Sequence, residues 1–340
     1  MKSILITGGA GFIGSNFVPY FAAKYPDYFL VNLDLLTYAG DLANLREMAG
    51  VKNYAFVKGD IGDAALVSAL FARYDFDGVI HFAAESHVDN SIANPRAFVE
   101  TNVLGAFTLL DAARAHWRGE KRRFHHISTD EVYGSLGATG LFTEATPYAP
   151  NSPYSASKAA SDMLARAFHH TYGIDATISN CSNNYGPKQH AEKLIPTIIR
   201  KALSGENIPL YGDGKNVRDW LYVLDHCRAI DLIFHRGAAG ETYNIGGKNE
   251  RTNLEIVAAI CAVLDERRPR AVSYKEQITF VADRPGHDRR YAIDATKLAT
   301  RLGWQAQESF DTGIVKTVEW YLAASGGECS IQLPRPSGRG

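Results

Sequence analysis

The stretch ITGGAGFIGSN, residues 6–16, determines the fold class of this chain. Gly8, Gly11 and Gly14 follow a short aliphatic run and open a pattern that is typical of a helix. A glycine-rich turn of this kind lets backbone N–H groups and the positive end of a helix dipole approach a pyrophosphate. A tight turn without a ligand would also need these glycines, so the surrounding sequence has to decide between the two readings.

The end of the next predicted strand supports the interpretation that the glycine turn binds a dinucleotide. Twenty residues after Gly14, the strand FLVNLD ends in Asp34. A carboxylate there accepts hydrogen bonds from an adenosine ribose and repels a 2′-phosphate. Leu35 and Leu36 follow it, so the adjacent sequence offers no cation to hold such a phosphate. We therefore expect NAD as the cofactor.

Runs rich in β-branched residues alternate with helical patterns through the first half of the chain. This alternation predicts an α/β fold, with a doubly wound parallel sheet of the Rossmann type. We expect strands over 3–7, 29–34, 54–58, 78–84, 123–129 and 176–182, and helices over 12–24, 41–48, 63–73, 95–117 and 153–172.

The pattern becomes irregular after residue 182 and predicts a second, smaller α/β domain that binds the substrate. We expect the NAD-binding domain to comprise 1–182, with about 217–246 returning to it. The substrate domain then comprises 183–216 and 247–325. The last residues, 326–340, have little to bury and are expected to form a disordered tail.

Composition excludes several classes of function. The chain has 340 residues, of which 46% are hydrophobic, and a formal net charge of −1. That charge balance favours neither nucleic acid nor a membrane surface as a partner. The first residues do not resemble a signal peptide or a spanning helix.

The cysteines and histidines give no metal or disulfide signal. Four cysteines are widely scattered, which suits neither a disulfide framework nor a CxxC site. The two adjacent histidine pairs, at 125–126 and 169–170, have no ligand spacing with cysteine or acid. We therefore expect no metal, and a reducing, cytoplasmic compartment.

Two carboxylates follow the predicted strand RFHHIST. Asp130 and Glu131 stand where open α/β sheets keep their binding crevice, so they are candidates for contact with a substrate. A solvated turn between strand and loop is the alternative for this pair.

A tyrosine and a lysine stand four residues apart in SPYSASKAASDMLARAF, residues 152–168. Ser152 and Pro153 are typical of a helix start, and the helix then places Tyr154 and Lys158 on one face. A phenol with a pKa of about 10 is a poor base at neutral pH, and a nearby ammonium favours the phenolate. Such a pair can also be purely structural, but the dinucleotide turn favours a catalytic role.

The sequence at this point resembles the extended short-chain dehydrogenase/reductase family, in which the glycine turn, the ribose aspartate, AAES and YSASK occur in the same order. The resemblance continues to about residue 320. Within the family the chain is similar to the nucleotide-sugar dehydratases, through the motifs STDEVYG, CSNNYGP, EKLIP, VRDWLYV and DRPGHDRRY.

The resemblance implies three sets of site residues. The implied catalytic residues are Thr129, Asp130, Glu131, Tyr154 and Lys158. The implied cofactor-binding residues are Gly8, Gly11, Phe12, Ile13, Gly14, Asp34, Leu35, Thr37, Asp60, Ile61, Phe82, Ala83, Ala84, Ser86, Thr101, Tyr154, Lys158 and Asn184. The implied substrate-binding residues are Ser86, Thr129, Asn183, Lys193, Leu194, Pro209, Tyr211, Arg218, Asn253, Asp283, Arg284 and His287. Leu35 departs from the family, because many relatives have lysine there, and this puts one peripheral cofactor contact in doubt.

The resemblance also implies a hydro-lyase that removes water from a nucleotide-diphosphate hexose, with dTDP-glucose as the expected substrate. Tyr154 would take a proton during oxidation at carbon 4. Glu131 would remove the proton of carbon 5, Asp130 would protonate the departing 6-hydroxyl, and Thr129 would polarise the ketone. Repulsion and desolvation let adjacent carboxyls differ in protonation as these roles require.

Two other functions remain open at this stage. One is a sugar 4-epimerase or decarboxylase that shares the oxidation step, although the Asp–Glu pair argues against it. The other is an NAD(H)-binding protein without catalysis. Recognition of thymine rather than uracil depends on one methyl group and is not determined by the sequence. The apolar faces of 95–117 and 153–172 predict a homodimer paired through those helices.

Overall fold

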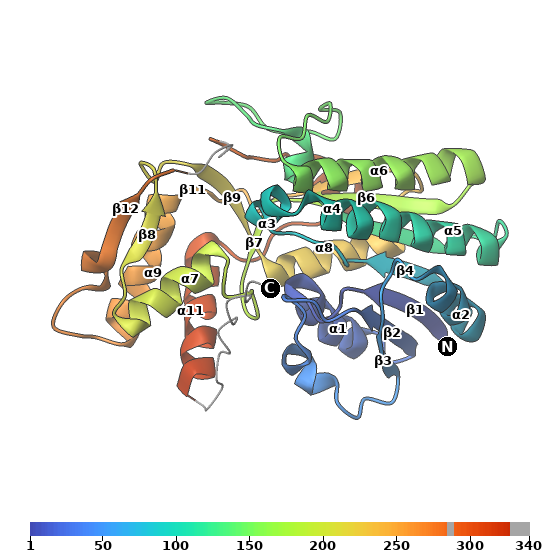
Figure 1. Ribbon diagram of the computed structural model, residues 1–340, viewed down its shortest axis with the longest axis horizontal. Helices are drawn as coiled ribbons and strands as arrows, with labels where there is room; N and C mark the ends of the chain where they lie inside the picture. The colour runs from blue at the N-terminus through green and yellow to red at the C-terminus, as the bar shows by residue number, and fades with distance from the viewer. Residues whose placement is uncertain (284–288, 327–340) are drawn as a thin grey trace, which may run out of the picture.

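A seven-stranded parallel sheet forms the larger part of the molecule, with strand order β10-β6-β5-β4-β1-β2-β3 (Figure 1). The computed structural model describes residues 1–283 and 289–326. Arg284 and His287, predicted to bind substrate, and residues 327–340 of the predicted tail lie outside these ranges. The strands of the sheet are β1 (Lys2–Thr7), β2 (Tyr28–Asp34), β3 (Tyr54–Lys58), β4 (Gly78–His81), β5 (Arg123–Thr129), β6 (Asp175–Cys181) and β10 (Thr242–Ile245).

The direction of winding reverses between β1 and β4, because the chain moves outward from β1 to β3 and then starts again on the other side of β1. The predicted doubly wound parallel sheet is therefore confirmed. In such sheets ligands bind at the carboxyl ends of the strands beside this reversal.

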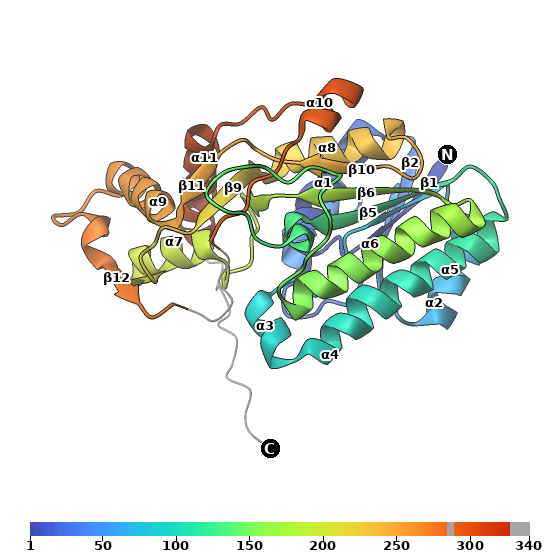
Figure 2. The ribbon, with the colours of Figure 1, turned by 90° about the horizontal axis from the view of Figure 1, so that it is seen from above.

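Helices cover both faces of the sheet, as Figure 2 shows. One face carries α2 (Ala64–Tyr74), α5 (Ala106–Trp117) and α6 (Pro153–Tyr172), and the other carries α1 (Phe12–Lys24) and α8 (Val223–Arg236). Because side chains alternate along a strand, Leu5 joins the first core whereas Ile4 and Ile6 join the second. Both faces are thus buried, which explains the continuous apolar runs of these strands.

The second part of the molecule is built around two small sheets. One has the order β11-β9-β7 and the other pairs β12 with β8. Their strands are β7 (Asn183–Tyr185), β8 (Ile208–Tyr211), β9 (Val217–Tyr222), β11 (Glu250–Thr252) and β12 (Ile278–Val281). The helices of this part are α7 (Leu194–Ser204), α9 (Asn253–Arg267), η4 (Tyr274–Gln277) and α11 (Phe310–Gly326), and α7, α9 and α11 are at the left of Figure 1. Helix α10 (Thr296–Leu302) instead packs on β10 and α8 of the larger part.

The stretch of about 217–246, expected to return to the large domain, is divided between the two parts. Strand β9 lies in the three-stranded sheet, whereas α8 packs on α1 and β10 forms the edge of the seven-stranded sheet. Across the residues that the structure describes, no helix is long and apolar enough to cross a membrane.

The predicted helix over 95–117 is interrupted. It consists of α4 (Pro95–Phe98), a π-helical turn η2 (Val99–Gly105) and α5, and the short helix α3 (Val88–Ala93) precedes it. The wider turn brings Asn102 to Ser157 on α6, where the amide Nδ2 donates to Oγ at 2.8 Å. The same side chain accepts from the N–H of Glu85 at 2.8 Å. Tertiary hydrogen bonds therefore hold the π turn. Short 3₁₀ segments complete the fold at η1 (Leu42–Met48) and η3 (Asp130–Tyr133).

Candidate active site

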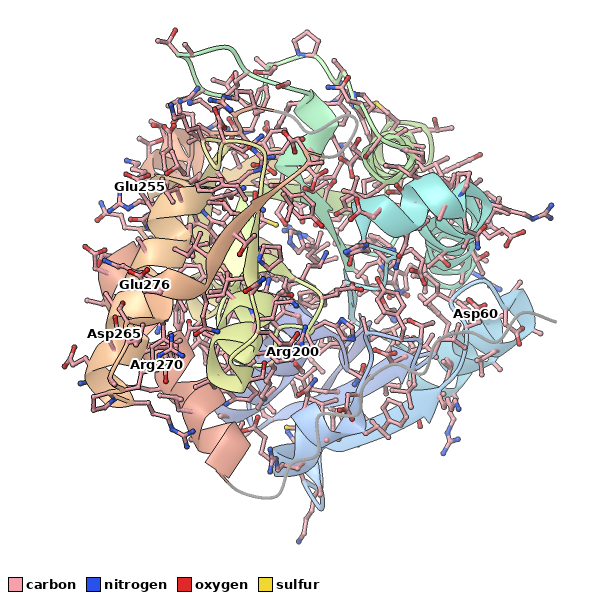
Figure 3. The ribbon with its side chains drawn as sticks, turned by 60° about the vertical axis from the view of Figure 1, so that its left-hand side comes forward. Asp60, Arg200, Glu255, Asp265, Arg270 and Glu276 are labelled. Carbon is pink, nitrogen blue, oxygen red and sulfur yellow. The ribbon has the colours of Figure 1, made fainter. Side chains whose placement is uncertain are left out.

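A cavity of about 320 Å³ lies at the carboxyl ends of the central strands and extends to the second part of the molecule. In Figure 3, Asp60 lies on the side of the large sheet, and Arg200 and the outer charged residues Glu255, Asp265, Arg270 and Glu276 lie across from it. The predicted residues that line the cavity are Gly8, Gly11, Phe12, Ile13, Gly14, Asp34, Leu35, Thr37, Asp60, Ile61, Phe82, Ala83, Ala84, Ser86, Thr101, Thr129, Asp130, Glu131, Tyr154, Lys158, Asn183, Asn184 and Lys193.

The glycine turn leaves room for a ligand at the amino end of α1. A Cβ on Gly14 would lie 2.3 Å from the carbonyl oxygen of Gly8, and one on Gly8 would lie 2.5 Å from the nitrogen of Ala83. Gly8 also has a φ of +72°, which favours glycine. These close approaches hold β1, α1 and the end of β4 together, and Gly11, the N-cap of α1, faces the cavity. The arrangement suits a pyrophosphate.

Asp34 stands at the end of β2 as the sequence predicts for a ribose-binding carboxylate. Its Oδ2 accepts from the N–H of Ala10 at 2.9 Å, and its Oδ1 accepts from the N–H of Leu36 at 2.8 Å. Each oxygen retains a second lone pair for a ligand hydroxyl. The carboxylate is thereby oriented before any nucleotide binds.

The start of α6 places Tyr154 and Lys158 against the end of β5. Ser152 and Ser155 form a capping box, and Pro153 occupies the first turn. Lys158 is buried, and its Nζ donates to the carbonyl oxygen of Ile127 at 2.8 Å. Burial lowers the pKa of this ammonium.

The environment of Tyr154 differs from our expectation that Lys158 would lower the pKa of the phenol. Burial raises the pKa of Tyr154 well above its ordinary value, and the negative charge of Glu131 acts in the same direction. A hydrogen bond with the side chain of Thr129 has the opposite, smaller effect. The ammonium is directed at the backbone of Ile127, which explains the difference.

The two adjacent carboxyls have unequal surroundings. Asp130 is 2% exposed, and burial followed by the charges of Glu131 and Asp219 raises its pKa well above the ordinary value. Its Oδ1 accepts from Thr129 Oγ1 at 3.4 Å, and its Oδ2 has no hydrogen-bond partner among the described residues. Glu131 is less buried and lines the same cavity. The pair can therefore present one protonated and one ionised carboxyl.

The predicted substrate residues of the second part are divided between those that line the cavity and those that lie outside it. Lys193, which lines it, donates from Nζ to the carbonyl oxygen of Ser86 at 3.1 Å and so joins the two parts of the molecule. The guanidinium of Arg218 lies over the ring of Tyr291 at 4.3 Å. Its positive charge lowers the pKa of Asp130 and so opposes the larger effect of burial. The predicted residues that do not line the cavity are Leu194, Pro209, Tyr211, Arg218, Asn253 and Asp283, and their substrate contacts remain predictions.

Sequence reasoning missed several residues that line the cavity. Glu192 Oε1 lies 3.7 Å from His190 Nδ1 and 4.0 Å from His87 Nε2. Burial and the charge of Glu192 raise the pKa of Glu85. The available signal was position, since Glu192 immediately precedes Lys193 in EKLIP. The missed residues of the lining include Glu85, Cys181, Ser182, Gln189, His190 and Glu192.

The segment 186–193 joins three elements at the edge of the cavity. Lys188 Nζ donates to the carbonyl oxygen of Ser15 at 3.0 Å and to Glu47 Oε1 at 2.7 Å. The hydroxyl of Tyr321, on α11, donates to the carbonyl oxygen of Gln189 at 2.7 Å. The segment is therefore fastened to α1, η1 and α11, and four of its residues, Gln189, His190, Glu192 and Lys193, line the cavity.

Comparison with known proteins relates this geometry to characterised enzymes. The sequence model of a family described as GDP-mannose 4,6 dehydratase matches residues 5–317. A dTDP-glucose 4,6-dehydratase of Xanthomonas campestris pv. campestris (strain B100) is 58% identical over 330 residues, covering 95% of this chain and 93% of that protein. The structure of the dTDP-glucose 4,6-dehydratase from Bacillus anthracis str. Ames in complex with NAD has a TM-score of 0.87 at 47% identity and covers 96% of this chain and 98% of that one. Another, from Streptomyces venezuelae with NAD and dTDP bound, has a TM-score of 0.88 at 48% identity, with coverage of 96% and 98%.

Replacing Gly14 with alanine is expected to remove bound NAD. The new Cβ would lie 2.3 Å from the Gly8 carbonyl oxygen, so α1 would have to move away from the turn. Overpacking of this kind costs about 1–3 kcal/mol, and we expect NAD per purified chain to fall about tenfold or more. The measurement is the NAD released on denaturation. Gly137→Ala is the matched control, because a Cβ there meets nothing within 4 Å; equal NAD in both variants would contradict the assignment of this turn.

Proposed function

The chain belongs to the GDP-mannose 4,6-dehydratase family, and we propose that it converts dTDP-glucose to dTDP-4-keto-6-deoxyglucose and water with tightly bound NAD. It is a hydro-lyase. The observation that carries this proposal is the position of a buried carboxyl, Asp130, whose pKa is raised, and of a second carboxyl, Glu131, beside the Tyr154–Lys158 pair in one cavity. An oxidoreductase would need only the pair, whereas loss of water also needs an acid and a base.

Oxidation at carbon 4 makes the later elimination possible, because a ketone there acidifies carbon 5. Tyr154 takes the proton of the 4-hydroxyl. Burial and the charge of Glu131 oppose the phenolate that does so, and in our proposal the positive charge of Lys158, one helical turn away, offsets part of this opposition. Thr129, which bonds to Tyr154, donates to the oxygen at carbon 4. When bound, NAD supplies the hydride acceptor for this oxidation and returns the hydride to carbon 6. The cofactor is therefore not consumed.

Elimination is divided between the two carboxyls. Glu131 removes the proton of carbon 5, and Asp130 gives its proton to the departing 6-hydroxyl, which leaves as water. The raised pKa of Asp130 supports the role of acid, since burial and the charge of Glu131 favour the protonated form of its carboxyl. The unpartnered Oδ2 is an additional support, because a substrate hydroxyl can become its partner.

The nucleotide is held, in our proposal, where the two parts of the molecule meet. Lys193 and Asn183 line the cavity there and can reach the diphosphate or the sugar. Arg218 offers a planar fork that suits two phosphate oxygens, and its packing on Tyr291 orients it. Preference for thymine over uracil is proposed from the relatives' names alone.

We further propose that the protein is a homodimer. Helices α5 and α6 lie side by side on the outside of the large sheet, as Figure 2 shows. Exposed apolar side chains gather along them and along the π turn, and these are Val99, Leu104, Phe107, Met163 and Tyr172. A cytoplasmic location is proposed as well, supported by the buried free thiols of Cys181, Cys227 and Cys261.

Glu131→Gln is expected to separate oxidation from elimination. The amide keeps the shape of the side chain but cannot remove the carbon 5 proton, so dehydration should fall by a factor of about 10²–10⁴. The absorbance of reduced nicotinamide should then accumulate on the protein with dTDP-glucose. Tyr154→Phe, as the contrasting variant, should give neither this absorbance nor exchange of the carbon 5 proton with solvent. Loss of the absorbance in both variants would show that Glu131 serves binding or oxidation instead.

Asp130→Asn is expected to slow the loss of water while leaving the carbon 5 base in place. Deuterium from solvent should therefore still enter carbon 5 in this variant, as mass spectrometry of recovered sugar can show. Glu131→Gln is the matched comparison and should block that exchange. If Asp130→Asn blocked it equally, the division of acid and base between the two carboxyls would be wrong.

The dimer is tested by sedimentation velocity at micromolar concentration. The wild type should sediment as a dimer, and the double variant Leu104→Glu/Met163→Glu as a monomer, because charge would enter the apolar interface. Phe280→Glu, at an exposed apolar residue of β12, is the control and should remain dimeric. A monomeric wild type would refute the proposal.

A further inference from the structure

A buried carboxyl that the reaction does not use lies one helical turn beyond Lys158. Asp162 is 1% exposed, stands on α6 and does not line the cavity. Tyr154, Lys158 and Asp162 follow one another at four-residue intervals, so they share the face of α6 that packs on β5. A charge buried at this position needs a partner to compensate it.

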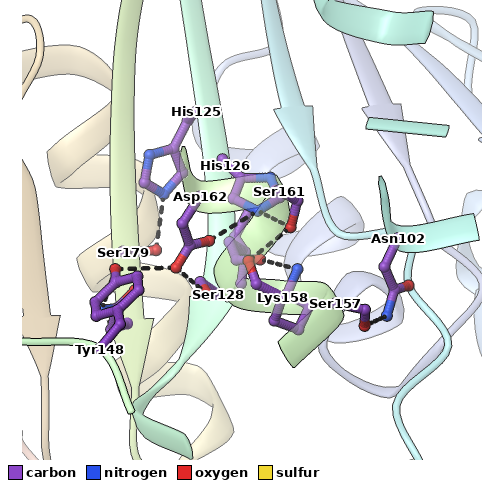
Figure 4. Close-up of polar contacts among 12 residues, drawn as sticks. Asn102, His125, His126, Ser128, Tyr148, Ser157, Lys158, Ser161, Asp162 and Ser179 are labelled. Atoms are coloured by element: carbon purple, nitrogen blue, oxygen red, sulfur yellow. Dashed lines mark hydrogen bonds and ion pairs between the residues drawn. The ribbon is translucent and has the colours of Figure 1, made fainter. Parts of the chain in front are cut away.

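Asp162 holds the end of β5, as Figure 4 shows. Its Oδ2 accepts from Ser128 Oγ at 2.8 Å and from the hydroxyl of Tyr148 at 3.0 Å. Its Oδ1 lies 3.1 Å from His126 Nε2. Ser128 stands between Ile127, whose carbonyl oxygen binds Lys158, and Thr129, which begins the catalytic turn. The carboxyl of Asp162 thus fixes the position of Ser128, which lies between Ile127 and Thr129.

The nearby charges couple Asp162 to Lys158. Burial raises the pKa of Asp162 to about 7, and the charge of Lys158 is the largest influence that opposes this rise. Conversely, burial lowers the pKa of Lys158, and Asp162 is the main influence against that. His126 does not supply the cation, because burial holds the pKa of its ring well below the ordinary value. The titratable groups that face this pair are His126 on β5, Tyr148 in the loop before α6, Tyr133 on η3, Cys181 on β6 and His81 on β4.

Resting on the proposed function, we propose that Asp162 is a positioning residue for the oxidation step. It keeps the positive charge on Lys158 and holds Ser128 at the end of β5, and it thereby allows Tyr154 to lose its proton. The need for such support follows from the surroundings of Tyr154, since both burial and the charge of Glu131 oppose the phenolate. If Lys158 were neutral, no positive charge on this face of α6 would offset the burial and the negative charge that disfavour the phenolate of Tyr154.

The test is the pH dependence of dehydration by Asp162→Asn. The amide keeps the shape and an acceptor for Ser128 but removes the charge, so the pKa of Lys158 should fall. Activity that needs the ammonium is lost above that pKa, and the alkaline limb of kcat/KM should therefore move to lower pH. We expect a shift of about one pH unit, which is within the range that a nearby opposite charge produces.

Two controls separate charge from packing. Ser161→Ala removes a polar group equally buried on α6, which donates to the carbonyl oxygen of Lys158 at 2.8 Å, but it leaves the carboxylate intact. This variant should keep the alkaline limb where the wild type has it. In the background Lys158→Met, adding Asp162→Asn should change neither the rate nor the pH profile further, because the residue through which Asp162 acts is gone.

An uncharged role for Asp162 would lower the rate at all pH values without moving the limb, and that result would overturn the proposal. If Asp162→Asn does not fold, Tyr148→Phe replaces it, because losing this donor raises the pKa of the carboxyl and so weakens the negative charge beside Lys158. Its limb should shift in the same direction by a smaller amount, and an unmoved limb would again contradict us. Failure of the proposed function is a different outcome, since the wild type itself would then form no 4-keto product at any pH.

Discussion

The contact between α6 and the carboxyl end of β5 is the constraint on which the site depends. Three side chains at four-residue intervals on α6, Tyr154, Lys158 and Asp162, bond to the three consecutive residues 127–129 of the strand. The turn that carries Asp130 and Glu131, the proposed acid and base, begins immediately after those residues. A displacement of the helix along the strand would therefore disturb the Tyr154–Lys158 pair and the Asp130–Glu131 pair at the same time.

Much of this arrangement could be predicted because its signals are local. The strands at 54–58 and 123–129 have the bounds expected from their β-branched runs. The helix at 153–172 begins at a serine cap with proline in its first turn and ends before Gly173, which takes a left-handed conformation. The glycine turn and Asp34 were recognisable for the same reason, since each function needs particular residue types at a fixed spacing.

The features that escaped prediction depend on contacts between distant segments. The π turn at 99–105 is held by Asn102, which hydrogen-bonds to Glu85 and to Ser157. No pattern within residues 95–117 predicts this turn. The role of Asp162 depends on Ser128 in another element, and along the helix it resembles any polar residue. Of the substrate residues expected from resemblance alone, Ser86, Asn183 and Lys193 line the cavity, whereas those further along the second part do not, because the shape of that part is not encoded in short motifs.

The fastening of segment 186–193 has a kinetic consequence. The cavity is bounded on one side by the glycine turn and on another by this segment, which is tied to Ser15, Glu47 and Tyr321. Motion of this edge requires these ties to open together, and local opening of several bonds is slow compared with diffusion. Segment 186–193 therefore behaves as part of the scaffold around the cavity and not as a free loop.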